Sequence, residues 1–191
     1  PMNDLADASD ALYVMDYDTR SQIFDACIAS ANAPFPGTVH GISRFLDLGI
    51  PAAKLILGVP WYGYRYECLP GATLESRYCD IESVPFRGVN CSDAAGSEMD
   101  YSKIRAVYHN ASVETSKEAR DANMNAPYFN ALEGNTVVQY WYDDQASLAA
   151  KSAYARASGL GGTGPFMFGM LADDPKEAAA IWTSLDEYAA A

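Results

Sequence analysis

The run of residues 54–60, Lys-Leu-Ile-Leu-Gly-Val-Pro, constrains the fold more than any other stretch of this 191-residue chain. A short apolar run bounded by turn-forming residues indicates a strand that is covered on both faces. Such strands occur in parallel sheets that carry helices on both sides. We therefore expect a central parallel strand here, and the polar and aromatic residues 61–64 follow directly at its end.

Residues 11–18, Ala-Leu-Tyr-Val-Met-Asp-Tyr-Asp, have a similar profile, because an apolar run leads into two carboxylates that flank a phenol. In parallel α/β sheets, binding and catalytic groups lie at the carboxyl ends of the strands. The two stretches therefore predict either a polar rim or a binding pocket where these strands end.

The rest of the chain is predicted to alternate between helices and strands. Helices are predicted over residues 20–32, 39–48, 101–109 and 143–158 and from 174 onward, and further strands over 136–142 and 162–168. Residues 65–100 lack a regular period and contain three cysteines, so we interpret them as an insertion or a long cross-linked loop. The alternation predicts an α/β fold on a parallel sheet, with residues 1–191 as a single domain.

Composition excludes several classes of partner. The formal net charge of −12 repels phosphate groups, so we expect no nucleic acid and no anionic membrane as a partner. No run of about 18 apolar residues is present, which argues against a transmembrane helix. The cysteine spacing and the isolated His40 and His109 do not match a zinc site, so we expect no metal and no cofactor.

The cysteines and two sequence triplets bear on localisation. Two disulfides are plausible, with three pairings open, among Cys27, Cys68, Cys79 and Cys91. Asn90 and Asn110 each begin an Asn-x-Ser acceptor triplet for N-glycosylation. Cross-linked loops and acceptor triplets together favour a secreted or lysosomal protein.

Three strand ends resemble motifs of glycoside hydrolase family 18. Residues 15–18 resemble its Met-x-Tyr-Asp motif, residues 58–63 its Gly-x-Pro-x-Tyr-Gly strand, and residues 142–162 its helix into the last strand. Residues 31–34 and 84–88 resemble the chitobiase-like members. The resemblance covers essentially the whole chain. It implies the C-terminal portion of a TIM (β/α)8 barrel, about strands 6 to 8 with their helices and an insertion.

The resemblance also implies roles for individual residues. Tyr17 and Asp18 match the catalytic positions that hold the substrate's N-acetyl group, whose carbonyl oxygen attacks the anomeric carbon in this family. A phenol can donate to one end of that amide and a carboxylate can accept from its N–H. Met15, Trp61 and Tyr62 match substrate-binding positions around the sugar.

The last strand departs from the family pattern. The family usually has a Trp there, forming the floor under the acetamido sugar, and the alignment through Gly162 places Phe166 at that position. A shifted register would place Phe168 there instead. Phenylalanine keeps an apolar face but lacks the area and the N–H of an indole, which is the one feature that favours a catalytically inactive protein.

The family's general acid is missing from this sequence. Its hallmark, Asp-x-x-Asp-x-Glu on the fourth strand, does not occur here, and residues 80–82 match only its last three positions in a loop. The resemblance thus implies the C-terminal part of a chitobiase-like hydrolase that cleaves oligosaccharides of N-acetylglucosamine by a substrate-assisted, retaining mechanism. We expect this chain alone to be inactive and to need the N-terminal barrel portion, which a separate chain could supply.

Two alternatives remain open. The first is an inactive, lectin-like barrel that binds chitin oligosaccharides. The second is a fragment that forms no site, because a partial barrel leaves strand edges unpaired and is expected to be unstable alone.

Overall fold

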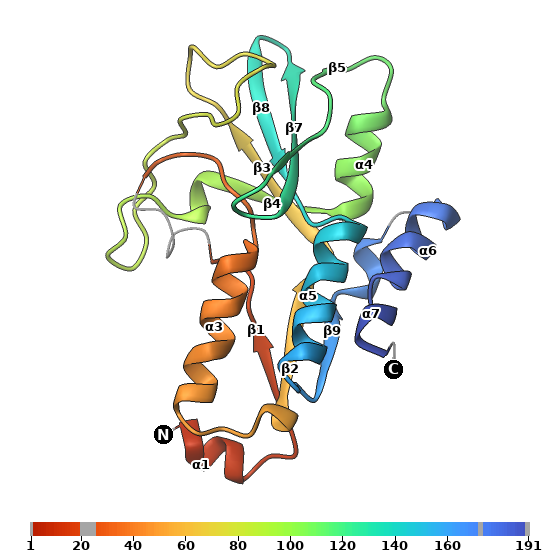
Figure 1. The fold of residues 1–191 in the computed structure, drawn as a ribbon. Helices are drawn as coiled ribbons and strands as arrows, with labels where there is room; N and C mark the ends of the chain where they lie inside the picture. The colour runs from red at the N-terminus through yellow and green to blue at the C-terminus, as the bar shows by residue number, and fades with distance from the viewer. Residues whose placement is uncertain (1, 20–25, 172–173, 190–191) are drawn as a thin grey trace.

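The computed structural model describes residues 2–19, 26–171 and 174–189. Two β-sheets lie one above the other, a three-stranded parallel sheet in the lower half and a six-stranded antiparallel sheet in the upper half (Figure 1). The chain passes from the lower to the upper sheet after its second strand and returns through helix α5.

The parallel sheet contains the predicted central strand. Strand β2 (Leu55–Pro60) lies between β1 (Leu12–Met15) and β9 (Gly162–Phe166), and it pairs in parallel with both. Every residue of β2 except Ile56 is buried. The apolar sequence of β2 is therefore explained by its central place, and all three strands end at the same edge of the sheet.

Helices cover this sheet. Helix α5 contacts β2, β9, α3 and the last two helices. Its N-terminus is fixed by a capping box, in which the Asp144 side chain accepts from the Ser147 backbone N–H. The α-helices of the lower half are α1 (Met2–Asp7), α3 (Phe35–Asp47), α5 (Gln145–Ala157), α6 (Pro175–Thr183) and α7 (Asp186–Ala189), and a 3₁₀ turn, η1, spans Ala52–Lys54.

The antiparallel sheet has the strand order β4-β3-β8-β7-β5, with β6 pairing to β7. Helix α4 (Tyr101–His109) follows β4 directly. The strands are β3 (Tyr62–Glu67), β4 (Gly96–Asp100), β5 (Glu114–Thr115), β6 (Ala119–Asp121), β7 (Ala126–Glu133) and β8 (Thr136–Trp141), and the remaining 3₁₀ turns are η2 (Asp93–Ala95) and η3 (Phe168–Met170).

This second sheet differs from the sequence prediction. The predicted strand over 136–142 forms, but it pairs antiparallel with β3 and β7 and takes no part in the parallel sheet. Strand β7 was not predicted, because its first six residues are all buried and give no alternation of polar and apolar positions. The sheet therefore runs from Tyr62 to Trp141, well beyond the insertion predicted over about 65–100.

The predicted helix over 20–32 is wrong for its second half, and residues 20–25 lie outside the described residues. Residues 26–32 are irregular, with one isolated β-bridge from Ile28 to Asp80. The Ala29 N–H donates to the Cys79 carbonyl, and the Cys27 carbonyl accepts from Ile81. Pairing with a distant loop thus replaces the helical hydrogen bonds that the apolar spacing suggested.

The next helix begins earlier than predicted. It starts at Phe35 with Pro36 in its first turn, where proline is tolerated because its missing N–H has no helical partner. It ends at Asp47, and Gly49 follows with a φ of +81°, as expected for a glycine that terminates a helix.

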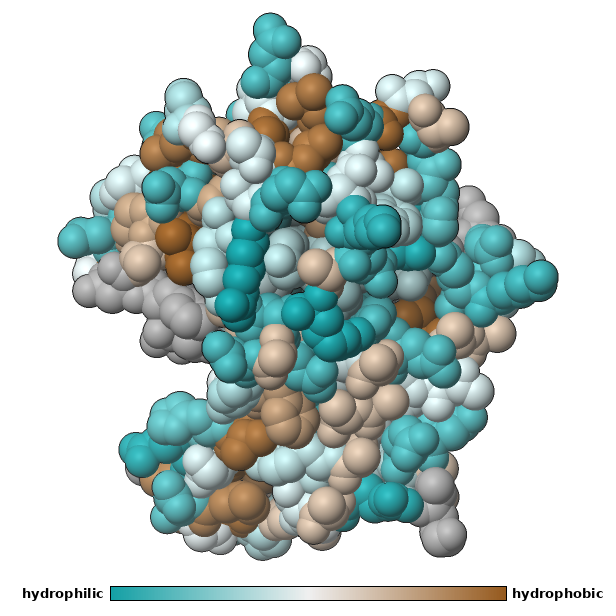
Figure 2. Space-filling model, turned by 45° about the horizontal axis from the view of Figure 1, so that its top comes forward, coloured by the Kyte–Doolittle hydropathy of each residue, from teal (hydrophilic) through white to brown (hydrophobic). Residues whose placement is uncertain are grey.

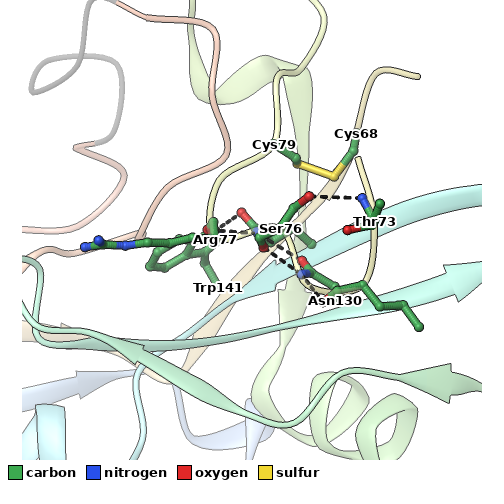
Figure 3. Close-up of a disulfide and its surroundings, with 9 residues drawn as sticks. Cys68, Thr73, Ser76, Arg77, Cys79, Asn130 and Trp141 are labelled. Carbon is green, nitrogen blue, oxygen red and sulfur yellow. Dashed lines mark hydrogen bonds between the residues drawn. A yellow bond between two sulfur atoms is a disulfide. The ribbon is translucent and has the colours of Figure 1, made fainter. Parts of the chain in front are cut away.

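The four cysteines form two disulfides, Cys27–Cys91 and Cys68–Cys79, which decides between the three pairings. The loop closed by Cys68–Cys79 is fastened to the antiparallel sheet, where the Asn130 amide donates to the Ser76 carbonyl at 2.8 Å (Figure 3). Nearby, Trp141 donates to the side chain of Gln139, which itself donates to Asn130. The loop is therefore held by a buried amide network as well as by the disulfide.

The surface is mixed in character. Figure 2 shows one face on which hydrophilic residues occupy most of the middle and hydrophobic residues form separate patches above and below. Within the described residues, no helix is both long and apolar enough to cross a membrane.

A buried ion pair yields a stability prediction. The Lys151 ammonium lies 2.6 Å from Asp143, and both side chains are 2% exposed. We expect Lys151→Met to destabilise the protein by about 3–5 kcal/mol, because it leaves a buried carboxylate without its partner. Urea unfolding measures the change. As a control, Arg44→Met removes an exposed ion pair to Asp47 and should cost at most about 1 kcal/mol. Equal losses in both variants would contradict the prediction.

Candidate functional site

Four of the residues singled out in the sequence meet at the shared strand edge. The ring of Tyr17 stacks on that of Phe166, with centroids 5.8 Å apart and planes at 28°. The Tyr62 ring meets both of these rings edge-on, at 5.9 Å from Tyr17 and 6.1 Å from Phe166. Asp18 completes the group, because its carboxylate accepts a hydrogen bond from the Tyr62 hydroxyl.

The Asp18 carboxylate is held from the antiparallel sheet. Its Oδ1 accepts from the Tyr62 hydroxyl at 2.8 Å and from the Tyr64 hydroxyl at 3.0 Å. The backbone of Asp18 has a φ of +57°, a conformation that Asp adopts more readily than most residues. The backbone N–H of Asp18 donates to the Asn32 side chain at 2.8 Å, which supports this conformation.

The phenols of the site are kept protonated. Burial, followed by the nearby Asp18 carboxylate, raises the pKa of Tyr62. Burial and the same carboxylate also raise the pKa of Tyr17. Both hydroxyls can therefore act as hydrogen-bond donors over the whole physiological pH range.

The other predicted site residues lie differently. Trp61 is 1% exposed, and its ring contacts are with Phe168 and Trp182, outside the group around Asp18. Phe168 thus belongs to this separate cluster, and Phe166 is the aromatic residue of β9 that lies in the group. Met15 is 69% exposed at the end of β1.

Asp16 lies beneath the site and was not predicted as functional. Its side chain packs against Gly41 of α3, where an added Cβ would lie 2.6 Å from the carboxylate, so a larger residue there would require the Asp16 side chain to move. Burial raises the pKa of Asp16 to about 7, although the Lys151 ammonium acts in the opposite direction. Asp16 is therefore a buried carboxyl whose pKa lies close to neutral.

Glu98 lies on the antiparallel sheet opposite Tyr64 in the β3–β4 register. Burial, followed by repulsion from Asp18 and Asp100, raises its pKa. Two hollows, of about 430 and 420 Å³, lie along the same sheet, and neither is lined by a residue of the group around Asp18. The described residues contain no cluster of three or more His, Cys, Asp or Glu side chains that could hold a metal ion.

Sequence reasoning missed Asn32, Tyr64 and Glu98. A signal for Tyr64 was present, since residues 62, 64 and 66 are all tyrosines and alternate residues of a strand share one face. Asn32 and Glu98 carried no comparable signal, because their place depends on the irregular segment 26–32 and on the pairing of β4.

The profile of "Glycosyl hydrolases family 18" matches residues 1–170. The chain belongs to this family. The likeness to chitobiases is confirmed as well: "probable di-N-acetylchitobiase 2" from Dictyostelium discoideum is 41% identical over 192 residues, which are 96% of this chain and 50% of that protein. The chain spans between 40% and 51% of the length of the curated chitobiase relatives that it matches.

Solved structures confirm the fold. A class V chitinase mutant from Cycas revoluta, crystallised with (GlcNAc)3, has a TM-score of 0.70 and 23% identity, covering 98% of this chain and 49% of that one. A chitinase-like agglutinin from Robinia pseudoacacia has a TM-score of 0.66 and 22% identity, covering 96% of this chain and 48% of that one. The predicted fold class, part of a TIM (β/α)8 barrel, is thereby confirmed, and the chain covers about half of each of these structures.

Asp16 gives a prediction about pH. Its pKa is 3.8 ordinarily and about 7 in the folded protein, so the unfolded chain ionises first as the pH rises. Its contribution to stability therefore falls between about pH 4 and pH 7 and stays low above that. We expect Asp16→Asn to match the wild type near pH 3.5 and to be more stable by roughly 2–4 kcal/mol at pH 7.5.

Thermal unfolding of both proteins across this pH range tests the prediction. Asp47→Asn, which changes an exposed carboxylate, is the matched control and should shift the curve little. A wild-type advantage at pH 7.5 would show that the ionised form of Asp16 is stabilising and would refute the expectation.

Proposed function

We propose that this chain is the C-terminal part of a chitobiase-like glycoside hydrolase that acts on oligosaccharides of N-acetylglucosamine. The observation that carries the proposal is the Asp18 carboxylate, held by two phenols beside the stacked rings of Tyr17 and Phe166. The similarity to di-N-acetylchitobiases and the (GlcNAc)3 bound to the Cycas revoluta chitinase support an acetamido sugar as the ligand.

The proposed chemistry is substrate-assisted and retaining. The carbonyl oxygen of the substrate's own acetamido group attacks the anomeric carbon while the glycosidic bond breaks. Asp18 accepts a hydrogen bond from the acetamido N–H, and the Tyr17 hydroxyl donates to the other end of the amide. The Tyr17 contact orients the carbonyl oxygen for attack, and the Asp18 carboxylate stabilises the cyclic intermediate, in which positive charge spreads over the former amide. Tyr62 and Phe166 enclose the sugar, and Met15 and Trp61 are assigned by the family resemblance alone.

The general acid must come from outside this sequence. Protonation of the leaving group requires the Glu of the Asp-x-x-Asp-x-Glu motif, which the 191 residues do not contain. In the structure β1 and β9 each pair with β2 alone, so an outer edge of each described strand remains for further barrel strands. We propose that the N-terminal portion of the barrel, in the same chain or in a separate one, occupies these edges and brings the acid.

The second candidate is a lectin-like barrel that binds the same sugars without cleaving them. Phe166 in the place of the usual Trp favours it, and the agglutinin from Robinia pseudoacacia is an example of a chitinase-like fold with that name. The phenol-held Asp18 favours the hydrolase, because a binding protein has no need to stabilise a charged intermediate.

A secreted or lysosomal location is proposed on the two disulfides and the two acceptor triplets. Asn90 and Asn110 both lie at exposed positions, as glycosylation requires.

The hydrolase proposal predicts the effect of removing the central carboxylate. In the enzyme with its complete barrel, Asp18→Ala should lower turnover of N,N′-diacetylchitobiose by about 10²-fold or more, because the intermediate loses its principal acceptor. The release of N-acetylglucosamine is the measurement. Asp47→Ala, at an exposed helical position, is the control and should retain activity. The isolated 191-residue chain should show no turnover.

Two results would count against the proposal. Wild-type turnover in Asp18→Ala would remove this residue from the mechanism. A complete barrel that binds the disaccharide but never cleaves it would favour the lectin.

A further inference from the structure

We propose that Tyr64 is a positioning residue for Asp18, and that the antiparallel sheet thereby sets the orientation of the carboxylate in the active site. This inference rests on the proposed function. Tyr62 belongs to the motif that the sequence already pointed to, whereas Tyr64 lies two residues further along β3, inside the second sheet.

The two tyrosines act on a single oxygen. Both hydroxyls donate to Oδ1 of Asp18, at 2.8 and 3.0 Å. Their rings are 6.4 Å apart and inclined at 51°, so the two donors approach Oδ1 from different directions. One hydrogen bond would leave the carboxylate free to turn about its Cβ–Cγ bond. Two such bonds restrict that rotation and leave Oδ2 as the oxygen that can accept from a substrate N–H.

Tyr64 is itself fixed by the sheet. Its backbone lies between Trp141 of β8 and Glu98 of β4 in the sheet register. Its ring stacks on Tyr66 with centroids 5.7 Å apart and planes at 18°, and the residue is 8% exposed. A donor held in this way does not have to reorganise when charge develops in the site, which is the condition for effective electrostatic stabilisation.

The contact also joins the segment after β1 to the antiparallel sheet. Asp18 follows the parallel strand β1, and its left-handed backbone conformation places it outside the regular sheet. Asn32 supports the Asp18 backbone, and the two tyrosines support the side chain. The orientation of the carboxylate therefore depends on how the antiparallel sheet sits over the strand ends.

A positioning role and a purely structural role predict different kinetics. If Tyr64 only stabilised the fold, its loss would lower the melting temperature and leave the kinetics of the folded fraction unchanged. If it orients Asp18, its loss should weaken an interaction that matters most in the transition state, so kcat falls more than KM rises.

The test is Tyr64→Phe in the enzyme with its complete barrel, assayed on N,N′-diacetylchitobiose. We expect kcat to fall by about tenfold or more, with KM within about threefold of the wild type, because one charge-assisted hydrogen bond is lost. The matched control is Tyr140→Phe, on β8 of the same sheet, which likewise removes a phenol donor from a carboxylate, that of Glu133. It should leave kcat unchanged.

A double-mutant cycle and a crystal structure complete the test. In an Asp18→Ala background, Tyr64→Phe should not lower the residual kcat further. In crystals of Tyr64→Phe, the Asp18 carboxylate should rotate away from its position in the wild type. The proposal is overturned if Tyr64→Phe has wild-type kcat, if its effect persists without Asp18, or if the carboxylate keeps its orientation. An inactive wild type would refute the proposed function instead, and the crystal comparison would still decide this inference.

Discussion

The passage of the chain through Trp61 is the constraint on which the rest of the structure depends. Strand β2 ends at Pro60 in the parallel sheet, and β3 begins at Tyr62 in the antiparallel sheet, so one residue joins the two. The Trp61 N–H donates to the Phe166 carbonyl at 2.6 Å, and its carbonyl accepts from the Tyr101 N–H at 3.2 Å. The residue is thus bonded to the end of β9 on one side and to the start of α4 on the other. With its ring buried, it fixes how the second sheet stands over the strand ends.

Because Trp61 fixes the connection between the two sheets, residues from both sheets can form one site. The parallel sheet supplies Tyr17, Asp18 and Phe166 at the ends of its outer strands, and the antiparallel sheet supplies the phenols that bind Asp18. Neither sheet alone would hold the carboxylate in a defined orientation. Both donors, Tyr62 and Tyr64, lie on β3, so the first strand of the antiparallel sheet to follow β2 contributes directly to the group around Asp18.

Local patterns in the sequence were sufficient for the parallel sheet. An unbroken apolar run identified β2, and the resemblance of residues 15–18 and 58–63 to family motifs identified the strand ends. The failures have different physical causes. Residues 26–32 have apolar spacing like that of a helix, yet their backbone pairs with the loop after Cys79. Strand β7 is buried along its first six residues. The spacing of its apolar residues therefore does not distinguish it from a buried helix. Asn32 lies in the irregular segment 26–32, so its contact with the Asp18 backbone was not predicted either.

Asp16 and Asp18, the two carboxyl groups near the end of β1, lie in different environments and are suited to different roles. Asp18 is exposed at the strand end and accepts two hydrogen bonds, which suits an acceptor for an acetamido N–H. Asp16 has a pKa of about 7, a value that would suit a general acid, but it lies buried against Gly41 of α3. In the proposed reaction a proton donor must reach the glycosidic oxygen, so the buried Asp16 is not suited to act as the general acid. Under the proposed function, the described site would hold and stabilise the acetamido group, and the proton for the leaving group would come from the Glu motif that the 191 residues do not contain.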